Sequence, residues 1–560
     1  MAYELIADTK GLSSPTAILC RRPFLLALLG LGVALRVFQY ASGTSLWFDE
    51  LSIARNLVHR STTQLLLEPL VYNQVAPVGF IVAEKLVSQV LGTNDLAFRF
   101  LPLLCGLAAL PLFLRLAERL LNGYAVPFAV AVFAIGAPFI RFSAEVKQYG
   151  IDLAATLALG LIALRLRDAD STPTRCVLAG IAGAAMVWFS QATVFVMAGL
   201  GAALVLAWLR DRDPQTRRAI LTTVPIWATA SVAALVVAIR HITPGTRAFM
   251  SEFWRARAGF FPWPLERASD VLWLWDRVTQ LFADEMILRY RWPALYSGLA
   301  IAGLGLLWRR ERFGALVLLG PLAVTVLAAV AHQYPFRTRL VLFLVPALVL
   351  AIAEAAEWIR RSAARLHPAV GGAVMAALFA APALALVETP PPYRVEDYKT
   401  VLAFLRAHRK AGDGVYVFSN TCGAMERYGA EYGLRREDWA VGGCWRDDLR
   451  PYLHDVDRYR GMPRVWFFAS SVPPFHPARL SIERYLGAIG VRREAIAVPS
   501  AKPLNPVSIE LFDLSDPARL AAASALTFPL EPLGDLRPLC GAWVLPVPPD
   551  SNNVVTGQRP

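Results

Sequence analysis

The chain has 560 residues, of which 56% are hydrophobic and 18% are charged, and its formal net charge is +13. Its mean hydropathy of +0.44 is too high for a soluble protein that hides its apolar residues in one core, so we expect an integral membrane protein. The basic residues form short clusters between apolar runs and no single basic face, which argues against a nucleic-acid partner.

About eleven apolar runs have the length of a membrane-spanning helix, roughly 17 to 25 residues. In chain order they lie at residues 23–41, 96–117, 123–141, 152–168, 175–190, 193–209, 219–239, 294–308, 313–331, 340–358 and 368–387. The predicted fold class is therefore an α-helical polytopic membrane protein, with about eleven transmembrane helices plus interfacial helices.

Arginine clusters occupy every second connection between these runs, and short cytoplasmic loops are where such clusters accumulate. They are Arg21 and Arg22, Arg115 and Arg119, Arg165 and Arg167, Arg217 and Arg218, Arg309, Arg310 and Arg312, and Arg360, Arg361 and Arg365. The pattern predicts a cytoplasmic amino terminus and, after an odd number of spans, a carboxyl-terminal region outside.

The stretch from Ala76 to Leu91 is ambiguous, because it is short and contains Glu84 and Lys85. Counting it as a span would place the downstream arginine clusters outside. We therefore interpret it as an amphipathic helix that lies in the membrane interface.

From residue 391 onward, polar helices alternate with short β-rich segments at 414–419, 464–470 and 507–514. This alternation predicts an external α/β domain over 391–545 with a partly parallel sheet, separated from the membrane domain (1–390) by the proline-rich segment 388–394. We expect residues 546–560 to be disordered. A Cys422–Cys444 disulfide is a hypothesis, since sequence does not fix connectivity.

The predicted topology gathers carboxylates and cations on the outer membrane face. The first outer connection contains Asp49, Glu50, Asn73 and Gln74; the second contains Glu145, Lys147, Tyr149 and Asp152; later ones contain Arg255, Arg257, Tyr334, Arg337 and Arg339. Ionisable groups at membrane depth are unfavourable by roughly 2.5 to 3.5 kcal/mol each, so they need partners or a ligand. A ligand phosphate would suit the lysine and the arginines.

Asp49 and Glu50 are adjacent, so their side chains diverge and we do not expect them to share a proton or a metal. We expect one to do chemistry and the other to support it, with Trp47 and Phe48 holding both at headgroup depth. Simpler interpretations stay open: the acids could cap a helix, and the second-loop charges could form local ion pairs.

The segment WFDELSIARN, which starts at Trp47, resembles the acidic motif of integral-membrane glycosyltransferases of the C superfamily, in particular the protein O-mannosyltransferase and aminoarabinose transferase group. The resemblance extends to NQVAP, GTNDLAFRFLP and FSAEVKQYGID, and YPFRTRLVLFLVP at 334–346 is similar to a later part of bacterial members. It implies a glycosyltransferase domain over 1–390, a sugar donor carried on a polyprenyl phosphate, and Asp49 as the catalytic base with Glu50 beside it.

This sequence departs from the family pattern at Asn73, Gln74 and Pro77, where many members have a His or Lys followed by two prolines. Acceptor binding is therefore expected to differ, with Asn73 and Gln74 as candidate acceptor-binding residues. Glu145 and Asp152 are alternative positions for the second acid that the resemblance implies. Some members of the superfamily use a divalent cation, so the metal question stays open, and no other cofactor is expected.

Together these observations predict an inverting glycosyltransferase of a bacterial inner membrane that acts at the outer face. Its predicted partners are a polyprenyl-phosphate sugar, membrane lipids and a glycan, lipid or protein acceptor. Lys147, Arg337, Arg339, Tyr334, Arg255 and Arg257 are candidates for binding the donor phosphate. The alternatives are a transporter or flippase of a lipid-linked saccharide and an assembly scaffold.

Overall fold

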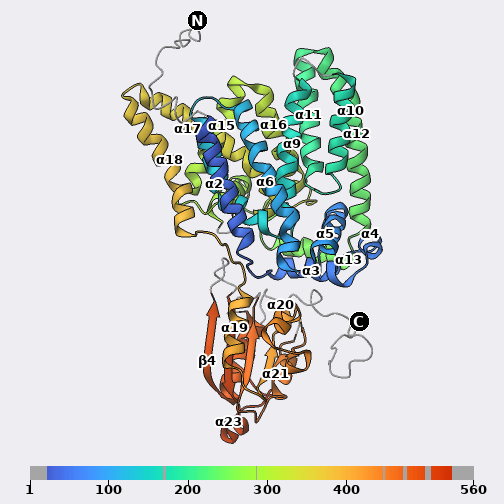
Figure 1. Ribbon diagram of the computed structural model, residues 1–560, viewed down its shortest axis with the longest axis vertical. Helices are drawn as coiled ribbons and strands as arrows, with labels where there is room; N and C mark the ends of the chain where they lie inside the picture. The colour runs from blue at the N-terminus through green and yellow to red at the C-terminus, as the bar shows by residue number, and fades with distance from the viewer. Residues whose placement is uncertain are drawn as a thin grey trace.

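The computed structural model describes residues 22–167, 172–284, 287–445, 448–470, 476–498 and 506–531. Figure 1 shows a bundle of long helices with a smaller domain that contains a sheet at one end. We call that end of the bundle, where α3, α4, α5 and α13 lie, the domain-side end. The tail predicted at 546–560 lies outside the described residues.

Helices make up the bundle and its connections. They are α2 (Arg22–Ala41), α3 (Phe48–His59), α4 (Thr62–Leu67), α5 (Val78–Leu91), α6 (Asp95–Leu120), α7 (Ala125–Ile135), α8 (Ala137–Arg141), α9 (Tyr149–Arg167), α10 (Pro173–Met186), α11 (Thr193–Asp211), α12 (Pro214–Arg240), α13 (Pro244–Arg255), α14 (Trp273–Ala283), α15 (Pro293–Arg310), α16 (Arg312–Val330), α17 (Val345–Ala364) and α18 (Pro368–Glu388), with 3-10 turns η1 (Phe142–Ala144), η2 (Ala268–Leu272) and η3 (Thr338–Leu344).

The predicted fold class of a polytopic helical membrane protein is confirmed. Within the described residues, 8 helices are long and apolar enough to cross a membrane, or up to 9 if the bent pair α7 and α8 is one span. Each of the predicted runs coincides with a helix or with this pair, but α10, with 14 residues, and α15 are outside that set. The helix α5, with 14 residues, covers the predicted interfacial segment.

The bend of 53° between α7 and α8 follows from a proline. Pro138 has no N–H, so the carbonyl of Ala134 loses the donor that a continuous helix would supply. The buried guanidinium of Arg36 from α2 replaces that donor, at 3.2 Å from the carbonyl oxygen of Ala134 and 3.3 Å from that of Phe133. Backbone carbonyls thus supply the hydrogen-bond acceptors that this guanidinium needs inside the bundle.

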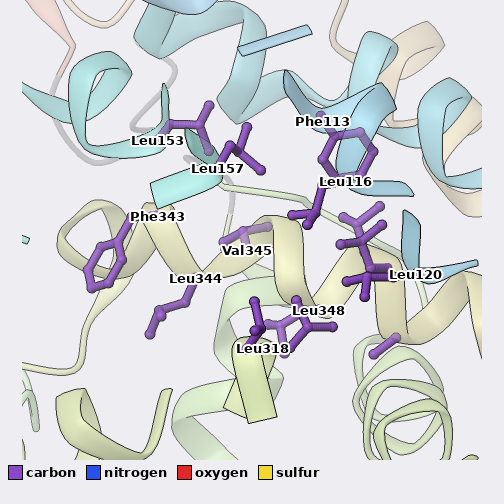
Figure 2. Close-up of a cluster of buried hydrophobic side chains, with 14 of the residues drawn as sticks. Phe113, Leu116, Leu120, Leu153, Leu157, Leu318, Phe343, Leu344, Val345 and Leu348 are labelled. Atoms are coloured by element: carbon purple, nitrogen blue, oxygen red, sulfur yellow. The ribbon is translucent and has the colours of Figure 1, made fainter. Parts of the chain in front are cut away.

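Apolar side chains from α6, α9, α16, η3 and α17 interlock in the bundle core, as Figure 2 shows for Phe113, Leu157 and Leu348. Where α11 meets α16 the backbones touch. A Cβ on Gly199 would lie 2.2 Å from the carbonyl carbon of Gly320. Close contact through small residues is a common way for membrane helices to pack.

The smaller domain is built on a five-stranded sheet with strand order β2-β1-β3-β5-β4. Its elements are α19 (Tyr398–His408), β1 (Gly414–Val417), α20 (Cys422–Tyr428), β2 (Ala440–Val441), α21 (Arg450–Asp457), β3 (Val465–Ala469), α22 (Pro477–Ile489), β4 (Val491–Val498), β5 (Val507–Asp513) and α23 (Pro517–Ala522), with 3-10 turns η4 (Ser419–Thr421), η5 (Gly429–Tyr432) and η6 (Arg436–Asp438). Strand β1 is parallel to β2 and β3, and β5 is antiparallel to β3 and β4. The prediction of a partly parallel sheet is confirmed.

Alternate residues of each strand point to opposite faces of the sheet. On one face Tyr416 and Phe467 pack with Tyr452 and Tyr485 of α21 and α22. On the other face the strands share one buried cluster with the first connection of the bundle, including Leu46 and Ile53, and with Tyr428 of α20 and Leu402 of α19. The sheet domain therefore packs directly onto the connection that contains the acid pair.

The predicted Cys422–Cys444 disulfide is wrong. Cys422 is a free, buried thiol at the start of α20, where it donates to Glu426 at 3.3 Å. Cys444 is disulfide-bonded, but not to Cys422. The fold places Cys422 against the membrane domain rather than against the other cysteine-containing loop, which the spacing of cysteines in the sequence does not reveal.

Candidate active site

Asp49 lies in the first turn of α3 and pairs with Arg339, which is 290 positions away along the chain. The guanidinium of Arg339 also donates to the Tyr149 hydroxyl at 2.9 Å, and its carbon lies 5.1 Å from the centre of the Trp47 ring. Asp49 retains 15% of its side-chain surface exposed, so this carboxylate is partly exposed. The structure thus brings together two predicted site residues from distant connections.

Glu50, the adjacent acid, has a different environment. Its carboxylate accepts two hydrogen bonds from Arg99 at 2.9 and 2.7 Å, one from the Val146 amide at 2.9 Å and one from the Trp47 amide at 3.2 Å. Only 2% of its side chain is exposed. Removal of either partner of this buried ion pair would leave an uncompensated charge, so the two connections that Glu50 joins depend on it.

Arg99 is a partner that sequence reasoning missed. It lies one turn into α6 and also donates to the carbonyl and hydroxyl of Thr44, at 2.7 and 3.0 Å. An arginine at the start of an apolar span is a signal that could have identified it, since such a charge is stabilised only by a specific partner.

Of the two candidates for the second acid, Glu145 lies with the first-loop acids. Its carboxylate is 3.2 Å from the guanidinium of Arg141 and lies in the electrostatic field of Glu50 and Asp49. Burial raises the pKa of Glu145, and the charge of Arg141 opposes that shift.

Asp152, on α9, lies near Tyr334. It is buried, and one of its carboxylate oxygens has no hydrogen-bond partner in the described part of the chain. Its charge acts on Tyr334, whose hydroxyl donates to the Leu340 carbonyl at 2.8 Å. Burial raises the pKa of Tyr334 well above its usual value, so this phenol stays protonated.

Lys147 is buried and donates to the amide oxygen of Gln74 at 2.6 Å. Burial lowers the pKa of Lys147, and the negative charge of nearby Asp49 opposes that shift. No ion pair joins Lys147 to a carboxylate among the residues that the structure describes. Its positive charge therefore has no direct counter-ion.

The candidate acceptor-binding residues lie beside this lysine. Gln74 also donates to the Tyr72 carbonyl at 3.2 Å, and it lines a mostly apolar cavity together with Ile81 and Trp188. Asn73 has a positive φ of 51° and accepts a hydrogen bond from the Thr246 hydroxyl at 3.4 Å. The cavity thus begins at Gln74, next to Lys147, and extends between α5 and α12.

Arginines of the later connections form a second group. Arg337 donates to Gln280 of α14, and Arg277 of α14 donates to the Arg257 carbonyl at 3.5 Å. Burial lowers the pKa of Arg277 to about 10, and the charge of Arg337 adds to this shift. Burial lowers the pKa of Arg257, and the positive charges of Arg337 and Arg339 lower it further. Mutual repulsion of this kind is relieved when an anion binds.

Arg255 is exposed at the end of α13, and Arg257 stacks 3.7 Å from the centre of the Phe253 ring. Sequence reasoning missed Arg277 and Gln280, although they lie three residues apart and hence on one face of a short amphipathic helix.

The three acids Asp49, Glu50 and Glu145 each have an arginine partner. Asp49 pairs with Arg339, Glu50 with Arg99, and Glu145 with Arg141. Across the described ranges, no group of three or more His, Cys, Asp or Glu side chains is arranged to hold a metal ion.

No protein-family model matches this chain, and no curated protein matches it. Among solved structures, the chain is similar to ArnT from Cupriavidus metallidurans bound to undecaprenyl phosphate, with 12% identity, a TM-score of 0.47 and coverage of 87% of this chain and 98% of that chain. It is also similar to the oligosaccharyltransferase AglB from Archaeoglobus fulgidus in complex with an inhibitory peptide and a dolichol-phosphate, with 13% identity, a TM-score of 0.46 and coverage of 84% and 72%.

A third similar structure is the arabinosyltransferase EmbB from Mycobacterium smegmatis, with 15% identity, a TM-score of 0.30 and coverage of 70% of this chain and 43% of that chain. These proteins are of the class that the WFDELSIARN segment resembles.

Proposed function

We propose that the protein is a membrane glycosyltransferase that moves a sugar from a polyprenyl-phosphate donor to an acceptor hydroxyl or amine. The observation that carries this proposal is the grouping of a partly exposed carboxylate, Asp49, with Arg339 and Lys147. A carboxylate next to phosphate-binding cations suits base-assisted transfer.

In the proposed reaction, Asp49 takes the proton from the acceptor as the acceptor oxygen or nitrogen attacks the anomeric carbon. The bond from that carbon to the phosphate oxygen breaks, and its electron pair leaves with the polyprenyl phosphate, so the anomeric configuration inverts. A phosphate monoester has a last pKa of about 6, so it departs without a general acid. One carboxylate is then sufficient, whereas a glycosidase needs two.

Lys147, Arg337 and Arg339 are proposed to hold the donor phosphate and to stabilise the charge that grows on it. Lys147 and Arg337 are bound by the amides of Gln74 and Gln280, which leave their charges available to an anion. Arg339 would move from Asp49 towards the phosphate, which also frees the base. Tyr334, Arg255 and Arg257 remain candidates for the rim of this site.

We further propose that the domain-side end of the bundle faces the periplasm of a bacterial inner membrane, with the amino terminus in the cytoplasm. Residues 1–390 are then the transferase domain and 391–545 the external domain. The arginine clusters of the opposite connections support this orientation.

The test uses purified full-length protein in proteoliposomes with a panel of polyprenyl-phosphate sugars, and measures release of polyprenyl phosphate. We expect Asp49→Asn to lower kcat by about 10²- to 10⁴-fold, the usual contribution of a positioned base. Asp211→Asn is the control, because this carboxylate pairs with Arg167 at an exposed site. Full transfer by Asp49→Asn would refute the proposed base, and movement of intact donor across the bilayer without release would indicate a transporter.

A further inference from the structure

The sheet domain holds the connection that carries Asp49 through its backbone. The Leu46 amide donates to the Tyr428 hydroxyl at 2.7 Å, and the Phe48 amide donates to the Glu396 carboxylate at 2.9 Å. Lys399 reaches the Gly43 carbonyl at 2.8 Å. The loop before α3 therefore takes its position from residues about 350 positions later in the chain.

Glu396 occupies the place of a helix cap. Phe48 is the first residue of α3, where a backbone N–H has no partner within the helix. The preceding residue, Trp47, provides no side-chain cap, whereas Ser, Thr, Asp or Asn is usual at that position. Glu396 supplies the missing acceptor from the sheet domain, and its negative charge suits a helix N-terminus.

Glu396 is itself held firmly. It is 2% exposed, and the Tyr398 hydroxyl donates to the same carboxylate oxygen at 2.7 Å. Tyr398 is fully buried at the start of α19. A carboxylate fixed in this way can transmit the position of the sheet domain to the first turn of α3.

We propose that Glu396 is a positioning residue for transfer, which caps α3 from the sheet domain and so sets Asp49 in its place against Arg339. The inference rests on the proposed function of Asp49. It gives the sheet domain a defined part in the reaction: alignment of the base.

Two of the three cations proposed to hold the donor phosphate are fixed by other contacts. Lys147 binds Gln74 and Arg337 binds Gln280, and neither contact involves the sheet domain. Loss of the cap should therefore disturb the base while leaving the Lys147 and Arg337 contacts intact, and Arg339 keeps its hydrogen bond to Tyr149. Donor binding should then change far less than the rate of transfer. A change in kcat without a change in donor KM distinguishes this role from a general loss of structure.

The experiment compares Glu396→Ala and Glu396→Gln in full-length protein, with rates normalised to the folded fraction from size exclusion. We expect Glu396→Ala to lower kcat by about 10- to 100-fold with unchanged donor KM, the effect of misplacing a reacting group. Glu396→Gln keeps an oxygen that accepts the Phe48 amide proton and should retain most of the rate. Arg394→Ala is the control, because the exposed Arg394 lies two positions before Glu396 and pairs with Asp397.

Hydrogen exchange tests the cap without any assay of activity. In Glu396→Ala, we expect faster exchange in a peptide that covers residues 44–52 and unchanged exchange in α9. If Glu396→Ala does not fold, Tyr428→Phe, which removes the acceptor of the Leu46 amide, should give a smaller loss of protection in the same peptide.

Unchanged exchange at 44–52 overturns the inference, as does a kcat of Glu396→Ala equal to wild type or a Glu396→Gln variant as slow as Glu396→Ala. Failure of the proposed function gives a different result, since wild type would then release no polyprenyl phosphate from any donor.

Discussion

Lys147 is a residue whose chemistry depends on its burial. We predict that Lys147→Ala raises donor KM by roughly 10- to 100-fold, which corresponds to a charge-assisted hydrogen bond of about 1.5 to 3 kcal/mol. Burial lowers the pKa of this lysine, so the ammonium loses its proton, and with it the attraction for phosphate, at a lower pH than an exposed lysine does. Donor KM should therefore rise on the alkaline side at a lower pH in wild type than in Lys147→Arg, whose guanidinium stays charged. Steady-state kinetics across pH provide the measurement, and identical alkaline profiles would contradict it.

The two adjacent acids of the first connection have different environments, and we therefore expect different roles for them. Asp49 and Glu50 are equivalent in the sequence as adjacent carboxylates. In the folded chain, Glu50 is enclosed by Arg99 and by backbone amides, while Asp49 remains partly exposed beside Arg339. A substitution at Glu50 should thus act mainly on stability.

At the scale of the element, α14 is a short amphipathic helix that supports a distant arginine. Gln280 holds Arg337, so we predict that Gln280→Ala raises donor KM several-fold by releasing that guanidinium, an effect of about 1 kcal/mol for a lost hydrogen bond. Thr279→Ala is a matched control, because the Thr279 hydroxyl bonds Ser297 at 3.1 Å. Kinetics with a fixed acceptor concentration measure both variants. Equal donor KM in the two variants would show that Gln280 does not position Arg337.

The helices were predictable because each apolar run is long enough to carry its own signal, and the strands β1, β3 and β5 were predictable from their β-branched and aromatic residues. Strand β4 was not predicted, since an edge strand that contains Arg492, Arg493 and Glu494 lacks an apolar pattern.

The grouping of outer-loop charges was predictable from topology, but their pairing was not. The contact between Glu50 and Arg99 joins residues 49 positions apart, and the contact between Phe48 and Glu396 joins residues 348 positions apart. No local sequence pattern predicts a contact between residues so far apart along the chain. The Cys422–Cys444 hypothesis was wrong for the same reason, because packing of the two domains decides where Cys422 lies.

At the scale of the whole molecule, Asp95 at the start of α6 is a main tie between the two domains. It pairs with Arg427 and Lys399, both at 2.8 Å, and accepts from the Tyr428 hydroxyl at 3.0 Å. We predict that Asp95→Asn speeds hydrogen exchange of α20 by roughly 10- to 100-fold, because hydrogen bonds to a charged group contribute about 1.5 to 3 kcal/mol.

Helix α22 is the internal reference for that measurement, since it packs on the opposite face of the sheet. Glu354→Gln, which removes an ion pair with Arg310 of the bundle, is the control and should leave α20 unchanged. Equal acceleration in α20 and α22 would indicate global destabilisation of the domain rather than release of an interface.

Lys147 and Arg337 are held by neutral amides, so under the proposed function the site attracts any phosphate that reaches it. Anionic lipids offer the same phosphate chemistry and are far more abundant than a polyprenyl carrier. Bilayer composition should thus tune turnover: a membrane rich in acidic headgroups competes for the site, and a zwitterionic one leaves it open.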